Sequence, residues 1–169
     1  MPAPVETATA TLPERFAIPW NLSEWVAKDQ ILAWAQEEIG TLDWANPELA
    51  AVMRAQPSWQ PRFYLVLLVY AYAMGVCDAE EAADLCYVDP GLKAAFRGAP
   101  PRPKSLTRFR IEHPGLIRWG LQQVFKRAVK ARFDLGGGLI PPGVKRLLRD
   151  TAGARLDAAR HLDRGQHDE

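Results

Sequence analysis

The chain has 169 residues, of which 48% are hydrophobic and 24% charged, and its formal net charge is +1. This length suits one domain with a buried core, and the composition is ordinary for a soluble globular protein. The start of the chain has no basic region followed by an apolar run, and the longest uncharged stretch, residues 63–77, is too short to cross a bilayer. We therefore expect a cytoplasmic protein with no membrane partner.

The small net charge conceals a strong asymmetry along the chain. Residues 1–96 contain 5 basic and 13 acidic residues, a balance of −8. Residues 97–132 contain 10 basic residues and 1 acidic residue, a balance of +9, and residues 133–169 contain 6 of each kind. A polyanionic partner is therefore expected to meet the segment from 97 to 132.

The first part of the chain predicts a disordered start and then helices. Residues 1–19 are rich in proline and alanine and are expected to be disordered. Asn21 or Ser23 can cap a helix that runs to about Ile39. After two proline breaks, residues 62–76 are apolar on every side, which is typical of a helix surrounded by other helices.

Two short helices are predicted next, over residues 78–87 and 89–98. Asp78 with Glu81 forms a variant of the capping box and opens the first of them. Asp89 opens the second, because aspartate suits the N-cap and the proline after it suits the first helical position.

The proline-rich run 99–103 predicts a stiff, non-helical connector. Ser105 is expected to cap a short helix that ends at His113. A long amphipathic helix should then run from Pro114 to about Arg132, with its basic residues away from the apolar stripe.

Residues 134–143 are predicted to be a glycine- and proline-rich linker, residues 144–162 a last helix and residues 163–169 a polar tail. No strand pattern bounded by turn signals occurs, so the expected fold class is all-α. We expect a compact bundle of about six helices around a central apolar helix, with a helix-turn-helix-like unit between Asp78 and Glu112.

Several sequence blocks occur in a particular order and spacing. They are Leu42-Asp43, Gln60-Pro61-Arg62, the tyrosine-containing apolar run 65–76, Ala82–Cys86 and Lys104–Arg110. Over about residues 20–130 this ordered set resembles the N-terminal domain of bacterial insertion-sequence transposases. The resemblance implies that residues 20–133 form a helical domain that binds double-stranded DNA.

The sequence departs from that family after the long helix. In full-length members the following linker leads into the first strand of an RNase H-like domain, which supplies a metal-binding carboxylate. Here the linker leads into a helix, and the aspartates on it cannot converge on two metal ions. We therefore expect no catalytic activity, no catalytic residue, no cofactor and no metal site.

The basic segment supplies the candidate DNA contacts. The resemblance makes the helix after Ser105 a recognition-type helix, and the basic side chains of the next helix could meet phosphates. The expected DNA-binding residues are Lys104, Ser105, Thr107, Arg108, Arg110, Arg118, Lys126, Arg127 and Lys130. In the alternative interpretation these charges form a solvated face that balances the acidic first half, and Ser105 serves only as a cap.

Other residues with reactive side chains have simpler interpretations. Cys77 and Cys86 are expected to be reduced core residues, and His113 belongs to a helix-breaking turn. A metal site is not expected at His161, Asp163, His167 and Asp168, because a polar tail has no core that would hold these side chains in a fixed geometry. No small-molecule ligand is expected.

The chain has six tryptophans, and Trp20, Trp25 and Trp59 near segment ends leave room for an apolar patch between two subunits. A homodimer is therefore one expected assembly. The sequence favours a non-catalytic, transposase-derived DNA-binding domain. The alternative is a protein–protein interaction module or homo-oligomer that has lost DNA binding.

Overall fold

The structure is a computed structural model that describes residues 15–55, 61–95, 100–135 and 140–167. Within these ranges it contains no strand, which confirms the all-α prediction. Eight α-helices and one 3₁₀ turn are described: η1 (Leu22–Glu24), α1 (Lys28–Gly40), α2 (Pro47–Ala55), α3 (Pro61–Ala73), α4 (Ala79–Val88), α5 (Pro90–Ala95), α6 (Pro103–Glu112), α7 (Pro114–Arg132) and α8 (Pro142–His167). The predictions for residues 1–14, Trp59, Gly98 and Asp168 lie outside the described residues.

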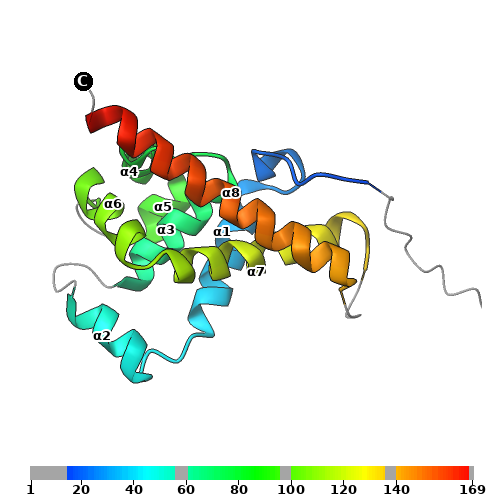
Figure 1. The fold of residues 1–169 in the computed structure, drawn as a ribbon, viewed down its shortest axis with the longest axis horizontal. Coiled ribbons are helices and arrows are strands. Elements are labelled where there is room, and N and C mark those ends of the chain that lie inside the picture. The colour runs from blue at the N-terminus through cyan, green and yellow to red at the C-terminus, as the bar shows by residue number, and fades with distance from the viewer. Residues whose placement is uncertain (1–14, 56–60, 96–99, 136–139, 168–169) are drawn as a thin grey trace, which may run out of the picture.

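Helix α3 is the centre of the bundle (Figure 1). Every residue from Tyr64 to Ala73 is buried, because α1, α4, α6, α7 and α8 all pack against it. The prediction of a surrounded apolar helix is confirmed. Gly75, with φ +80°, turns the chain away after the helix, and the side chain of Trp20 occupies the place that a Cβ atom would need.

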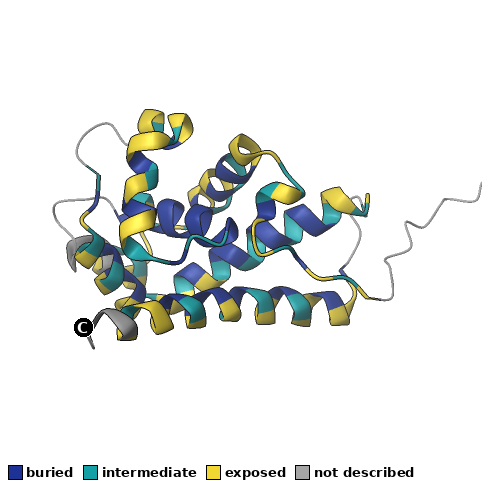
Figure 2. Cartoon of the chain, turned by 90° about the horizontal axis from the view of Figure 1, so that it is seen from above, coloured by how far each residue is buried: buried dark blue, intermediate teal, exposed yellow. Residues whose placement is uncertain are grey.

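Helices α7 and α8 form a hairpin along one side of the bundle. Helix α7 has the predicted bounds, and α8 runs back across it (Figure 1). Figure 2 shows that α8 is buried along the side facing the bundle and exposed along the outer side. The buried apolar residues of α8 include Val144, Leu148, Ala152, Leu156 and Ala159. The helix continues to His167, beyond the predicted end at residue 162.

The predicted start of the first helix is wrong. Asn21 does act as a cap, but only for η1, where its side chain accepts a hydrogen bond from the Ser23 backbone N–H. The chain then leaves the helical path, because Trp25 packs against Phe16 and Phe133. Helix α1 begins afresh at Lys28.

Two proline signals were also misinterpreted. Asn46-Pro47 is the first of the two proline breaks predicted before residue 62, yet it opens a helix, because the Asn46 side chain accepts a hydrogen bond from the Glu48 N–H at the start of α2. Ser105 does not cap α6, because that helix starts earlier, with Pro103 in its first turn. A proline at the first helical position suits a helix start, since it has no N–H to satisfy.

Candidate nucleic-acid interface

The nine sequence-predicted DNA-binding residues lie on α6 and α7 and do not share one surface. Lys104, Arg108 and Arg118 are exposed. Arg110 is buried, with 6% of its surface accessible. The residues of intermediate exposure are Ser105, Thr107, Lys126, Arg127 and Lys130.

The outer face of α6 carries less positive charge than its sequence suggests. Leu106 and Phe109 hold the inner face in the core. On the outer face the Arg108 Nε lies 2.8 Å from the Glu112 carboxylate, one helical turn away. Because this i,i+4 pair offsets one charge, Lys104 is the net basic group that remains on that stripe of the helix.

Ser105 has an internal partner. Burial raises the pKa of Tyr64, and a side-chain hydrogen bond between Ser105 and the Tyr64 hydroxyl opposes that rise. The side chain therefore joins α6 to the central helix α3, which accounts for a serine at this position without a phosphate.

Arg110 and Arg127 are engaged in ion pairs with distant segments. Arg110 pairs with Asp163 of α8. Arg127 forms ion pairs with both Glu37 and Glu38 of α1. Arg127 fits the alternative interpretation, in which the basic residues balance the acidic first half of the chain. Arg110 does not fit it, because this side chain is buried and its partner lies in α8.

Helix α8 adds basic residues that the sequence interpretation left out. Lys145, Arg149, Arg160 and Arg164 follow one another at intervals of 4, 11 and 4 residues. At about 100° per residue these intervals keep all four side chains within an arc of roughly 100°. The equal numbers of acidic and basic residues after position 132 concealed this flank, although its spacing is visible in the sequence.

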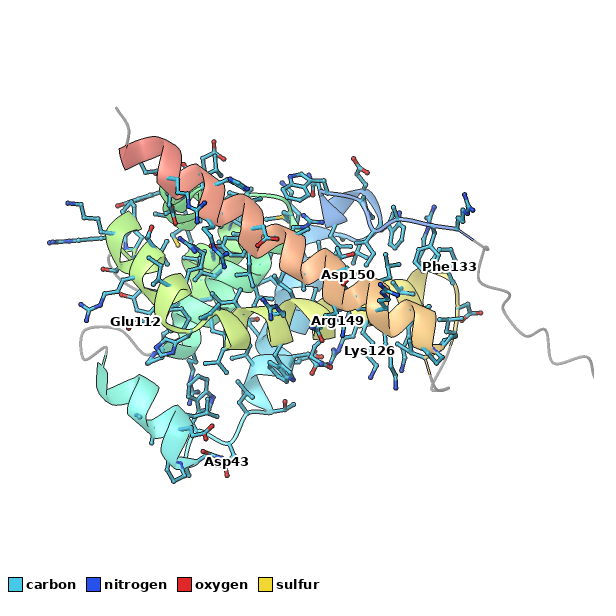
Figure 3. The ribbon with its side chains drawn as sticks, viewed as in Figure 1. Asp43, Glu112, Lys126, Phe133, Arg149 and Asp150 are labelled. Carbon is cyan, nitrogen blue, oxygen red and sulfur yellow. The ribbon has the colours of Figure 1, made fainter. Side chains whose placement is uncertain are left out.

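Helix α7, which packs on α8, carries a second row of basic residues. Arg118, Lys126 and Lys130 occupy one side of α7, within an arc of about 120° by the same helical geometry. Helices α7 and α8 pack against each other, and Figure 3 labels Lys126 of α7 and Arg149 of α8 in the region where the two ribbons cross in this view. We call this surface the basic seam, and its members are Arg118, Lys126, Lys130, Lys145, Arg149, Arg160 and Arg164.

The charges of the basic seam are largely uncompensated. Arg149 lies 3.8 Å from Asp150, beside which it is shown in Figure 3. The other six members form no ion pair with any residue that the structure describes. A row of exposed and half-exposed cations, most of them without internal partners, is the kind of surface expected to attract a polyanion.

Arg155 is an internal residue that the sequence interpretation missed. It is 1% exposed, and its guanidinium donates hydrogen bonds to the backbone carbonyls of Pro19, Trp20 and Tyr72. The helical spacing of α8 could have revealed this burial. Arg155 lies three residues after Ala152 and four residues before Ala159, so it shares their buried face.

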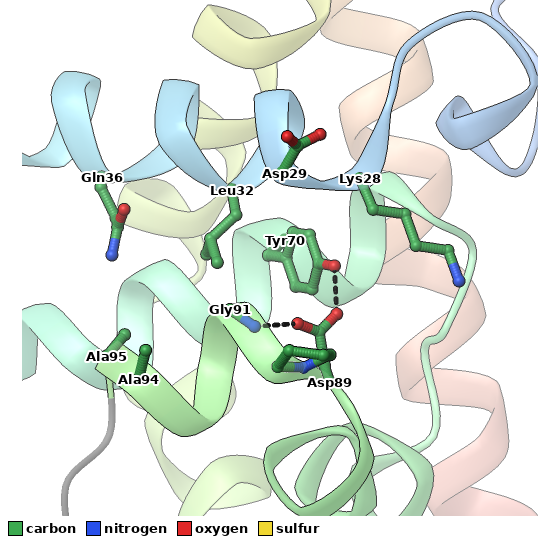
Figure 4. A pocket seen from close by; sticks show the side chains of 10 residues that line it. Lys28, Asp29, Leu32, Gln36, Tyr70, Asp89, Gly91, Ala94 and Ala95 are labelled. Atoms are coloured by element: carbon green, nitrogen blue, oxygen red, sulfur yellow. Dashed lines mark hydrogen bonds between the residues drawn. The ribbon is translucent and has the colours of Figure 1, made fainter.

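A groove of about 580 Å³ lies on another side of the molecule, between α1 and α5 (Figure 4). The Tyr70 hydroxyl donates to the carboxylate of Asp89 at its floor, and Asp89 also accepts from the N–H groups of Gly91 and Leu92. Burial raises the pKa of Tyr70, with the charge of Asp89 acting in the same direction, so the phenol remains a donor. This pair caps α5 and joins it to α3.

Cys77 and Cys86 are buried and free, and burial raises the pKa of each thiol to about 11. In the described part of the chain, no cluster of three or more acidic, histidine or cysteine side chains is arranged to hold a metal ion. None of the described helices combines the length and apolar character needed to cross a membrane. Comparison with protein-family models, curated proteins and solved structures finds no match.

Proposed function

We propose that this protein binds duplex DNA through the basic seam, without cleaving it. The observation that carries the proposal is the alignment of seven lysine and arginine side chains along α7 and α8, six of them without an ion-pair partner among the described residues. Phosphate contacts from such side chains supply most of the affinity of sequence-independent DNA binding. The resemblance to the DNA-holding domain of transposases favours DNA over other polyanions.

Helix α6 has a secondary part in this proposal. Lys104 is exposed on the helix that would act as the recognition-type element, so it extends the contact beyond the basic seam, whereas Arg108 is exposed but paired with Glu112. Arg110 and Arg127 are not included, because their guanidinium groups are already paired with carboxylates.

The proposal is tested by comparing two double variants with equal changes in net charge. Lys126→Gln with Lys130→Gln removes two charges from the basic seam, and Lys28→Gln with Lys93→Gln removes two exposed charges from α1 and α5. We expect the seam variant to make the slope of log affinity against log salt less negative by about 1.8, at about 0.9 per lost phosphate contact. The α1–α5 variant should leave the slope unchanged, as measured by fluorescence anisotropy with a labelled duplex.

Two results would contradict the proposal. One is the absence of binding to duplex DNA at low salt, and the other is an equal loss of affinity in both variants. Absence of binding would favour the alternative of a protein-interaction module. The exposed apolar side chains of Tyr87, Val88 and Ile111 are the observation that supports that alternative.

A further inference from the structure

A groove between α6 and the C-terminal half of α8 combines several arginines with an apolar wall. Its volume is about 340 Å³. Thr107 and Ile111 of α6 line one side, and Arg160 and Arg164 of α8 line the other. Figure 1 shows these two helices at the same end of the molecule, where α8 approaches its C-terminus.

The lining of this groove has an excess of positive charge. Three arginines, Arg110, Arg160 and Arg164, line it together with one carboxylate, that of Asp163. Asp163 is paired with the buried Arg110, so it neutralises that side chain. Arg160 and Arg164 remain without an ion pair to any described residue, which leaves the groove with two uncompensated charges.

These positive groups also act on one another. Burial lowers the pKa of Arg110, Tyr72 opposes this shift, and the smaller effect of the Arg160 charge lowers the pKa further. An anion placed between the two helices would relieve this repulsion. The excess positive charge of the groove therefore favours binding of an anion.

The geometry of the arginines favours a phosphate group over a simple halide. Arg160 and Arg164 are four residues apart, which places their Cβ atoms about 5–6 Å from each other on one face of α8. Two planar guanidinium groups at that separation can each donate paired N–H groups to the oxygens of one phosphate. Thr107 adds a hydroxyl donor from the opposite wall.

The apolar part of the groove suits the group attached to that phosphate. Ile111 is 63% exposed on α6 although it is a large hydrophobic residue, and Pro114 lies beside it in the lining. A sugar or base carried by the phosphate could cover this surface and remove it from water.

We propose that the groove between α6 and α8 binds a phosphate group through Arg160, Arg164 and Thr107, with the attached sugar or base against Ile111. The phosphate could be part of a DNA backbone at the end of the basic seam, in which case the inference rests on the proposed function. It could equally belong to a free nucleotide. The recognising chemistry is the same for both sources.

The test measures binding of adenosine monophosphate, adenosine and a short DNA duplex to the full chain by NMR titration in a phosphate-free buffer. Each ligand is compared in the unmodified protein and in Arg160→Gln, Arg164→Gln and Arg146→Gln. Arg146 is a control on the same helix, because it is exposed and lies outside the groove; unlike Arg160 and Arg164, it lies near a carboxylate, 3.8 Å from Asp150. Losing one guanidinium contact with a phosphate should weaken binding by about tenfold. Arg146→Gln should change the affinity for adenosine monophosphate by less than about twofold.

Each combination of results supports or overturns the inference. Selective weakening of adenosine monophosphate binding by the groove variants, with adenosine bound much more weakly, supports a site for a free nucleotide. That site would stand even if the duplex did not bind, and the proposed DNA function would then fail. Selective weakening of duplex binding alone assigns the site to a backbone phosphate. The inference is overturned if neither adenosine monophosphate nor the duplex binds, if adenosine binds as well as its monophosphate, or if all three variants weaken binding equally. If the duplex binds and the groove variants do not weaken its binding, the proposed DNA function stands without the groove.

Discussion

Arg155 shows how a single residue joins three distant segments. Its guanidinium reaches backbone carbonyls of the segment before η1 and of the end of α3, and it lies over the rings of Trp20 and Phe125. Burial lowers its pKa to about 10, so the side chain is still positively charged at neutral pH. Carbonyl oxygens and aromatic faces, rather than a carboxylate, therefore compensate for the loss of hydration.

We expect Arg155→Ala to lower the free energy of unfolding by about 3 kcal/mol or more, because it leaves a cavity and removes the donor for buried carbonyls. Arg149→Ala is the control on the same helix, since Arg149 is exposed, and it should change stability by no more than about 0.5 kcal/mol. Chemical denaturation followed by circular dichroism measures both. Equal stabilities for the two variants would show that the contacts of Arg155 contribute nothing.

At the scale of the elements, the close packing of α3 against α7 depends on a small residue at the point where the two helices cross. Gly120 of α7 is buried, and a Cβ atom built on it would lie 2.6 Å from the Cγ2 atom of Val69 on α3. The absence of a side chain at Gly120 therefore allows the two helices to approach closely. Gly153 of α8 differs, because no atom lies within 4 Å of the position that its Cβ would take.

The two glycines predict opposite effects of the same substitution. Gly153→Ala should stabilise the protein by roughly 0.5–1 kcal/mol, since alanine favours a helix interior more than glycine does. Gly120→Ala should destabilise it by about 1–2 kcal/mol, because overpacking outweighs that gain. Thermal unfolding of both variants measures the difference.

A second-site change separates overpacking from other causes. Val69→Ala removes the methyl groups that would meet the new side chain at Gly120. The double variant, Gly120→Ala with Val69→Ala, should therefore lose less stability than the two single variants lose in total, by about 1 kcal/mol. Simple additivity would mean that Val69 is not the obstacle.

At the scale of the whole molecule, α8 belongs to the same hydrophobic core as the helices before the 134–143 segment. Its apolar face packs on α7, and Arg155 ties it to the N-terminal part of the described chain. An arm joined only by a flexible linker would lack these contacts. The core is consequently shared between segments from both ends of the chain.

This arrangement predicts one cooperative unfolding transition for the full chain. The far-ultraviolet circular dichroism of the helices and the fluorescence of the tryptophans should change with the same midpoint in denaturant. Different midpoints for the two signals would indicate that part of the helical structure separates before the rest of the bundle unfolds.

Local physical chemistry in the sequence determined the elements of this protein. The start of α4 was predictable because the Asp78 side chain accepts a hydrogen bond from the Glu81 N–H, and α7 because a proline opens an amphipathic pattern. Both helix starts depend on interactions between residues that are only a few positions apart in the sequence. The proline at α2 carried the same information and was misinterpreted, whereas the interruption before α1 depends on the contact of Trp25 with distant Phe133.

The tertiary structure decided which charges face solvent. Arg127 and Glu37 are 90 residues apart, and no local pattern indicates that they pair. Arg110 likewise pairs with Asp163 of the distant helix α8. The spacing of Arg149 and Arg160 shows in the sequence that they share a flank of α8, but only the structure shows that α8 packs on α7. Periodicity fixes the angle of a side chain around its own helix, but only the packing of helices fixes what lies opposite it.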